Sequence, residues 1–571
     1  MKTRYIVPLL LFCLFACMAC EDDKTEMPRL FRPSFIASSC FAEDNTITLA
    51  WRTSGEATSY TVELSQDATF QSEKLETQTV EHGKCVFTNL RYETKFYARV
   101  RANNESLAIT SNWTEMGSSI STLSRTIPKI LYAVEGSRIS ETSVEIKWVV
   151  SEKNPVDGLA IWEEGTTEER QISLENASAG QYTITGLTPR TTYYVALTNS
   201  AAPEGAEKYN QQRFTTAGMP ADAVVVEDGV DLMDKIKAGM TDASKQALVF
   251  QLKNGVDYYL TAGGEVAAKT GDIKLTKSIA LLANPGERPT LYIREGCFNV
   301  KPESGNMPDI EYFVVDNVNI KETWTDSKPS KGSKTRLLNI GKHDAGTDFT
   351  IDRFEITNSD IVLPSAVLMM SDASEGVTTI NHIRIDNCLV SGINTSAVSK
   401  QFGFIHAINK GSNVWNDVSV TNSTFYEFYI SPGVFGAPTA NVPIAAGNKV
   451  VISNCTFYNW GSNKDGKNTY RAVGNFSKLT APLNLSVSNC VFGSSESKVL
   501  DAGGINLDSK GNYCTSDFEK MSDAGLTLIS LDTDDASLFR NIEENDFTVI
   551  DAESVIYKSE YGDPRWITVL D

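Results

Sequence analysis

The chain has 571 residues, of which 41% are hydrophobic and 22% charged, and its formal net charge is −20. This length is too great for one hydrophobic core and predicts three or four domains of ordinary globular composition. The acidic balance excludes binding to nucleic-acid phosphates through a broad basic surface, so we expect no nucleic-acid partner.

The N-terminus has the pattern of an export signal. Lys2 and Arg4 precede an apolar stretch over residues 6–16, which is too short to span a bilayer. Because Cys20 follows a small residue, residues 1–19 resemble a bacterial lipoprotein signal, with Cys20 as the lipidated first residue of the mature chain. An ordinary secreted protein with an unlipidated cysteine is the alternative.

The residues after Cys20 extend this resemblance. Residues 20–30 form a polar, acidic tether, and the acidic run 21–23 resembles the surface-export signal of Bacteroides-type lipoproteins. The signal departs from the usual pattern at Cys17, where leucine is common, and Cys17 is itself a competing lipidation site. The resemblance implies a protein on the cell surface, held at the outer membrane by its acyl chains.

Two β-sandwiches are predicted over residues 31–124 and 127–217, where short alternating strands are separated by turn residues. The segment 187–196 resembles the tyrosine corner of fibronectin type III domains, and residues around Phe96 match it more loosely. Each region also contains a tryptophan at the end of an alternating strand, where that family places its core tryptophan. We therefore expect these two side chains in the cores: Trp51 and Trp148.

A third domain is predicted over residues 222–571, after a boundary at Gly218-Met-Pro220. Its first element is expected to be a helix over 231–243 that covers the open end of a stacked architecture. Residues 246–252 and 273–282 are predicted to supply the first strands.

A phrase of two alternating aliphatic residues followed by asparagine recurs through this domain. Its asparagines lie 29 to 41 residues apart, a spacing typical of stacked repeats, at Asn317, Asn358, Asn387, Asn422, Asn454 and Asn489. The aliphatic residues and the asparagine share one parity, so we expect them on the same side, with asparagine amides hydrogen-bonded from coil to coil at a left-handed bend. The pattern resembles right-handed parallel β-helices of the pectate-lyase type, and function is then expected in the long turns between copies.

The cysteines predict packing rather than metal or redox chemistry. Three of the ten lie in the signal or directly after it, and three others directly follow a repeat asparagine, at Cys388, Cys455 and Cys490. This constant position after the asparagine indicates stacked, buried thiols. Whether Cys40 and Cys85 of the first sandwich are bridged is left open by the sequence.

The C-terminal string Gly562-Asp-Pro-Arg-Trp566 is the most specific short motif of the chain. Together with the tandem fibronectin-like regions and the signal, it resembles a group of Bacteroides-type surface lipoproteins whose β-helix has no assigned function. Many members of that group are encoded beside pectin- or glycan-degrading enzymes. The resemblance therefore implies polysaccharide and other glycan-uptake proteins as partners, and it supplies no active site.

A catalytic alternative rests on one coil of the repeat. A polysaccharide lyase needs a base beside a uronate carboxylate, and Ca²⁺ or cationic side chains to neutralise that carboxylate. Arg384, Asp386 and His382 offer such groups, but neighbouring coils offer mainly hydroxyls. We therefore expect no cofactor, with Ca²⁺ required only if the chain were a lyase.

The leading hypothesis is polysaccharide binding, in which pectin is one candidate ligand, without catalysis. Sugar sites combine aromatic faces with orienting polar groups, and loop aromatics of the repeat domain are the candidates for it: Trp324, Trp415, Tyr426, Tyr429 and Trp460. The alternatives are a lyase or another glycan-active enzyme, and a structural or adhesive surface protein.

Overall fold

The computed structural model describes the chain from residue 29 to residue 570 with internal gaps. The described residues are 29–72, 74–260, 271–294, 296–322, 336–364, 367–372, 375–392, 403–407, 412–429, 433–436, 449–461, 470–476, 483–495, 497–501, 503, 505–519 and 525–570. The expected lipidation residue Cys20 and the candidate Trp324 lie outside them. The fold is all-β, and it separates into two compact units, Met1–Thr126 with Asn199–Lys208, and Ile127–Thr198 with Tyr209–Asp571.

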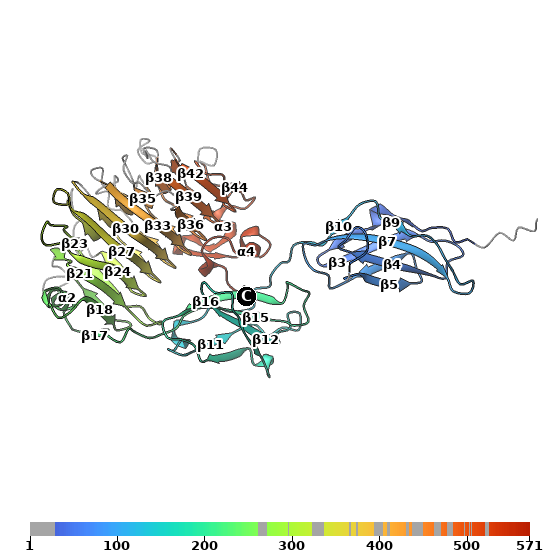
Figure 1. Cartoon of the computed structure of the whole chain (residues 1–571), viewed down its shortest axis with the longest axis horizontal. Coiled ribbons are helices and arrows are strands. Elements are labelled where there is room, and N and C mark those ends of the chain that lie inside the picture. Colours follow the sequence, from blue (N-terminus) through green and yellow to red (C-terminus); the bar gives the residue numbers. More distant parts are fainter. Residues whose placement is uncertain are drawn as a thin grey trace, which may run out of the picture. The chain divides into compact units, whose positions relative to one another are not determined.

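The first sandwich has two antiparallel sheets, as the alternating pattern predicts (Figure 1). One sheet contains β1 (Ser34–Phe35), β2 (Phe41–Glu43), β3 (Thr46–Arg52) and β6 (Lys84–Phe87). The other contains β4 (Ser59–Ser65), β5 (Glu76–Val80), β7 (Lys95–Asn104), β8 (Ile109–Thr110), β9 (Thr114–Glu115) and β10 (Ile120–Ser121). Trp51 is only 2% exposed, which confirms it as a core residue. Cys40 and Cys85 are separate thiols.

The second sandwich pairs a two-stranded with a four-stranded sheet. The strands are β11 (Ser143–Lys147) and β14 (Gln181–Thr185), and β12 (Gly158–Glu163), β13 (Arg170–Ser173), β15 (Thr192–Thr198) and β16 (Lys208–Thr215). The Tyr193 hydroxyl accepts a hydrogen bond from the Thr188 backbone N–H at 3.0 Å, which confirms the tyrosine corner of fibronectin type III domains. Trp148 is 4% exposed and lies in the core.

Helix α2 (Leu232–Thr241) begins the third domain and lies at its open end, as expected (Figure 1). The Asp231 carboxylate accepts a hydrogen bond from the Asp234 backbone N–H at 3.0 Å, so it caps the helix. The apolar face of α2 joins the core of the following strands through Ile236, which is fully buried. The predicted helix therefore forms, two residues shorter at its end.

Three parallel sheets build the third domain as a right-handed β-helix, and one turn of the chain contributes a strand to each. In the described residues, the sheet whose strands carry the repeat phrase, hereafter the repeat sheet, contains β17 (Val224–Val226), β18 (Ala247–Leu252), β21 (Lys277–Leu282), β24 (Asp309–Asp316), β27 (Asp348–Thr357), β30 (Val377–Asp386), β33 (Ser412–Thr421), β36 (Lys449–Ser453), β39 (Leu483–Ser488) and β42 (Ile505–Lys510). Figure 1 shows these strands stacked in chain order.

The other two sheets follow in each turn. The second sheet contains β19 (Asp257–Tyr259), β22 (Thr290–Ile293), β25 (Asn319–Glu322), β28 (Asp360–Val362), β31 (Leu389–Ser391), β34 (Thr424–Tyr426), β37 (Thr456–Tyr458), β40 (Val491–Phe492), β43 (Tyr513–Cys514) and β44 (Ile529–Ser530). The third contains β20 (Gly271–Lys274), β23 (Gly296–Val300), β26 (Arg336–Ile340), β29 (Val367–Ser371), β32 (Ile405–Ala407), β35 (Phe435–Gly436), β38 (Arg471–Asn475) and β41 (Lys498–Asp501). The apolar stretch 273–282 is therefore shared by β20 of the third sheet and β21 of the repeat sheet.

Each repeat asparagine lies one residue after a strand of the repeat sheet, at a bend. All six have positive φ angles between 50° and 58°, a left-handed conformation that asparagine tolerates better than most residues. The bend ends the strand alternation, so the aliphatic residues and the following cysteines face inward, whereas the asparagines are half-buried at the outer edge. The expectation that the asparagines share the inward side was therefore wrong.

The interior consists of stacked apolar side chains. Phe425, Phe457 and Phe492 come from adjacent coils, with ring centroids 5.2 and 5.1 Å apart and nearly parallel planes. Burying each such side chain stabilises the fold by roughly 1.5–3 kcal/mol. The cysteines that follow the repeat asparagines are fully buried in the same core, as expected, and burial raises the pKa of the Cys388 thiol to about 12.

The C-terminal residues cover the outer face of the second sheet, using α3 (Asp535–Leu538), β45 (Phe539–Asn541), β46 (Asp546–Val549) and α4 (Val555–Ser559). The motif Gly562–Trp566 joins this cover to successive coils by hydrogen bonds. Asp563 is 1% exposed, and its carboxylate accepts a hydrogen bond from the Thr424 hydroxyl at 2.7 Å. The Trp566 indole N–H donates to the same hydroxyl oxygen at 2.7 Å. The motif therefore has a structural role, and residues 562–566 are hereafter called the C-terminal clasp.

Candidate functional site

Strand β30 carries the three residues of the catalytic alternative on its outer face. His382, Arg384 and Asp386 alternate with Ile383 and Ile385, which are buried in the core. Period-two geometry therefore brings the three residues to one face, as the sequence predicts. Their surroundings differ, because His382 is exposed whereas Asp386 is 2% exposed.

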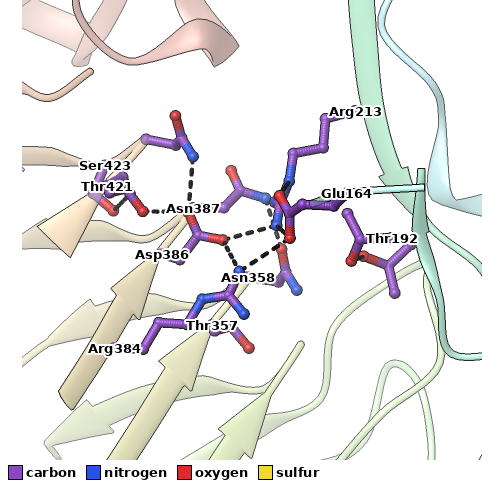
Figure 2. A network of polar contacts seen from close by, with 12 residues as sticks. Glu164, Thr192, Arg213, Thr357, Asn358, Arg384, Asp386, Asn387, Thr421 and Ser423 are labelled. Atoms are coloured by element: carbon purple, nitrogen blue, oxygen red, sulfur yellow. Dashed lines mark hydrogen bonds and ion pairs between the residues drawn. The ribbon is translucent and has the colours of Figure 1, made fainter. Parts of the chain in front are cut away.

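Asp386 is held by donors from three directions (Figure 2). Its Oδ2 atom lies 2.9 Å from Nη2 of Arg384 and 2.9 Å from Nη2 of Arg213 in strand β16. Its Oδ1 atom accepts hydrogen bonds from the Thr421 hydroxyl at 2.7 Å and the Asn422 amide at 2.8 Å. Both oxygens of this buried carboxylate are thus satisfied.

The electrostatics of Asp386 disfavour a role as general base. Burial acts to raise the pKa of its carboxyl, but the charges of Arg213 and Arg384 and the hydrogen bonds from Thr421 and Asn422 together hold that pKa below its ordinary value. A carboxylate with a lowered pKa has little tendency to take a proton near neutral pH. Asp386 is therefore better suited to positioning than to proton abstraction.

Glu164 completes the network from the second sandwich (Figure 2). It lies directly after β12, and its Oε1 atom accepts a hydrogen bond from Nε of Arg213 at 2.8 Å. Its Oε2 atom lies 3.5 Å from Nη2 of Arg384. Two guanidinium groups and the carboxylates of Glu164 and Asp386 thus balance in charge and join the sandwich to the β-helix.

His382 belongs to a different surface hollow. Its Nδ1 atom lies 3.7 Å from Oδ2 of Asp417 on the adjacent strand β33. A hollow of about 290 Å³ lies here, and Arg384 and Lys449 also line it. The structure thus brings Arg384 together with Asp386, while His382 pairs with Asp417, a residue that the sequence reasoning did not select.

Two cavities lie along the asparagine edge of the β-helix, between that edge and the second sandwich. The first, of about 440 Å³, is lined by Asn284, Asn317, Asn358 and Asn387, with Arg384 and Asp386 beside them. The second, of about 480 Å³, is lined by Asn387, Asn422, Asn454 and Asn489. Asn387 and Arg213 line both cavities, so the two are adjacent; together they are hereafter called the asparagine cleft, and the Asp386 network lies at the first of them.

The amides of this cleft bond to one another as well as to carboxylates. The Asn387 amide N–H donates to Asn358 at 2.8 Å, and the Asn489 amide N–H donates to Asn454 at 3.2 Å. The coil-to-coil bonding expected for the ladder is thus present, but it is interrupted where Asn358 and Asn422 donate to Asp316 and Asp386 instead. Each amide has two N–H donors, of which each of these bonds uses one.

The four aromatic candidates within the described residues do not line this cleft. Trp415 is 2% exposed and Trp460 is 0% exposed, so neither presents a ring face to a ligand. Tyr426 is 9% exposed and packs under the C-terminal cover, and Tyr429 is half-buried against the main core. The prediction that they are loop residues was wrong for Trp415 and Tyr426, which lie within strands β33 and β34.

Among the described residues, no group of three or more His, Cys, Asp or Glu side chains is placed to hold a metal ion. In the same part of the chain, no helix has the length and apolar character needed to cross a membrane. Besides Asp417, sequence reasoning missed Arg213 and Glu164, because a sandwich strand gives no signal of which other domain it meets.

The comparisons with known proteins give limited matches. Residues 450–566 match a family described as a domain of unknown function, DUF5123, and the match ends at the last residue of the C-terminal clasp. No curated protein matches the chain.

Solved structures similar to the chain include two from chicken. The FN1-FN3 domains of chicken CNTN1 are 16% identical and cover 34% of this chain and 69% of their own, with a TM-score of 0.15. A two-domain fibronectin type III segment of chicken tenascin is 16% identical and covers 33% of this chain and 100% of its own, with a TM-score of 0.19.

Proposed function

We propose that this protein binds polysaccharide without cleaving it, in the asparagine cleft, as a lipid-anchored protein of the cell surface and a component of a glycan-uptake system. The observation that carries the proposal is the cleft itself, two adjacent cavities lined by half-buried asparagine side chains from successive coils. Adjacent strands of a sheet lie ~4.8 Å apart. A regular row of hydrogen-bonding groups suits a repeating, hydroxyl-rich chain.

The polar groups around the amides support binding rather than turnover. Thr192, Thr215 and Thr357 contribute hydroxyl-bearing side chains to the first cavity, and Arg190 and Arg288 contribute cations. Each of the two cavities falls within the ~300–1,000 Å³ range of ligand sites. The Asp386 carboxylate is held by two arginines and its pKa is lowered, which suits a group that positions those arginines rather than one that takes a proton.

A second candidate function is a lyase at the His382 hollow. There His382 would take the proton from the carbon beside a uronate carboxylate, which Arg384 and Lys449 would neutralise. The electrons of that C–H bond would form a carbon–carbon double bond as the bond from the next carbon to the leaving sugar oxygen breaks, and that oxygen would take a proton from water. The observation in its favour is the placement of a histidine, two cations and Asp417 around one hollow. Against it stands the ion pairing of Arg384 with Asp386 and Glu164.

Electrophoresis of the purified protein in gels that contain different polysaccharides, alongside ultraviolet absorbance of the same mixtures, distinguishes these functions. We expect retardation in at least one polysaccharide and no absorbing unsaturated product, because Asp386 is held by two arginines and its lowered pKa makes that carboxylate a poor base. Product formation that is abolished in His382→Ala would establish the lyase instead. Neither retardation nor product with any glycan would overturn both candidates and favour a structural or adhesive role.

A further inference from the structure

An aromatic pair lies on the second sandwich next to the asparagine cleft. Trp162 of β12 and Tyr194 of β15 are register partners, and their rings stack with centroids 5.8 Å apart and planes inclined by 16°. Both side chains are half-buried. Stacked aromatic rings that remain partly accessible differ from the candidates in the β-helix, since Trp415 and Trp460 are enclosed in the core.

Tyr194 connects this pair to the polar network. Tyr194, on the second sandwich, lines the second cavity together with Asn422 and Asn454 of the β-helix. Its hydroxyl donates a hydrogen bond to Oε1 of Glu164 at 3.3 Å, the same atom that accepts from Arg213. The Tyr194 hydroxyl is therefore fixed at the sandwich wall of the second cavity, which the asparagine side chains also line.

Rings and amides on facing walls are the two components of a carbohydrate subsite. An aromatic ring offers flat apolar surface to the C–H face of a sugar, and its orientation costs little entropy because the side chain has few rotatable bonds. Amides opposite the ring offer donors and acceptors for the sugar hydroxyls. The described β-helix residues of the cleft supply the amides but no aromatic ring.

We propose that Tyr194, supported by Trp162, is the stacking subsite for a sugar ring of the bound chain, so that the second sandwich is a wall of the binding site and the polysaccharide contacts both domains. This inference rests on the proposed function and assigns binding residues to it. The ligand class is a neutral or acidic polysaccharide with a pyranose C–H face, contacted by Tyr194 on one side and by the asparagine row on the other.

The two roles available to Tyr194 are distinguished by two substitutions in the full-length protein. Tyr194→Phe keeps the ring and removes the bond to Glu164, whereas Tyr194→Ala removes both. With a polysaccharide that retards the wild type, calorimetric titration is expected to show affinity within about twofold for Tyr194→Phe and at least about tenfold weaker for Tyr194→Ala, a tenfold loss being ~1.4 kcal/mol. Trp162→Ala is expected to weaken binding to an intermediate extent.

The control is Tyr182→Ala, since Tyr182 is an exposed tyrosine, 36% accessible, on β14 in the other sheet of the same sandwich. It should bind like the wild type. Equal losses for Tyr194→Phe and Tyr194→Ala would assign the effect to the Glu164 bond and overturn the stacking subsite. Wild-type affinity of Tyr194→Ala would overturn it as well, while the proposed function would stand. If the wild type bound no polysaccharide, both proposals would fail together.

Discussion

Replacing Asp386 with alanine is expected to destabilise the protein by roughly 3–5 kcal/mol, because it leaves two cations close together without their shared partner. Arg213 and Arg384 both bond to its Oδ2 atom, and Arg213 is itself only 18% exposed. The Thr421 hydroxyl and the Asn422 amide would lose their acceptor at the same time. Urea unfolding of the full-length protein, followed by circular dichroism, measures the change.

The pH dependence of Asp386→Ala gives an independent readout. Because the folded-state pKa of Asp386 lies below its unfolded value, its contribution to stability is present above the unfolded pKa of about 4 and is lost as the pH falls through the folded pKa. The difference between wild type and variant should therefore shrink as the pH is lowered through this range. A difference that stays constant from neutral to strongly acidic pH would contradict the charge network as its cause.

Asp417→Ala is the matched control for this experiment. Asp417 lies on the outer face of the same sheet, with a side chain that is 63% exposed, and faces His382 rather than a guanidinium. Exposed ion pairs contribute little, so its substitution should change the free energy of unfolding by less than ~1 kcal/mol. If Asp386→Ala were as mild as Asp417→Ala, the network would have no structural role.

Trp460→Ala alone is expected to lower the free energy of unfolding by roughly 3–5 kcal/mol, because it creates a cavity in the core. The indole is fully buried between Phe492 and Phe518, and its N–H donates to the Lys498 carbonyl at 2.8 Å. Removing it leaves a large cavity and an unsatisfied carbonyl in a core that is close-packed. Calorimetric unfolding of the full-length protein measures the effect.

The comparison of Trp460→Ala with Trp460→Phe tests whether Trp460 is a core residue or a sugar platform. The phenylalanine variant retains most of the apolar contact and should recover much of the lost stability, because large buried aromatic rings lose least when another aromatic replaces them. A gel that contains polysaccharide should retard the phenylalanine variant as much as it retards the wild type. Weaker retardation at unchanged stability would return Trp460 to the binding site.

The repeat phrase predicted the architecture well because its physics is local. Alternating aliphatic residues determine which side of a strand faces inward, and an asparagine with positive φ ends the strand, so the sequence predicted the strand ends and the buried cysteines. The prediction was wrong for the asparagine itself, which was expected to face inward with the aliphatic residues. Parity does not continue through a left-handed bend, and the asparagine side chains accordingly lie at the outer edge.

The candidate site was predictable only in part. The alternation of β30 indicated that Arg384 and Asp386 share a face, and the structure joins them in an ion pair. Nothing in the sequence indicated that Arg213, 173 residues away, would meet the same carboxylate, or that Glu164, 220 residues from Arg384, would meet that arginine. Contacts between domains depend on their docking, which no local period encodes. The aromatic pair on the second sandwich was missed for the same reason.

Blocking the asparagine cleft is the most direct test of the account. Thr192 of β15 lines the first cavity, and Thr192→Trp should fill part of it while leaving the fold intact (Figure 2). Thr183→Trp, at an exposed position of β14 in the other sheet, is the control. In titrations with a retained polysaccharide, we predict at least about tenfold weaker binding for Thr192→Trp and unchanged binding for Thr183→Trp. Unchanged affinity of a folded Thr192→Trp protein would contradict the cleft as the binding site.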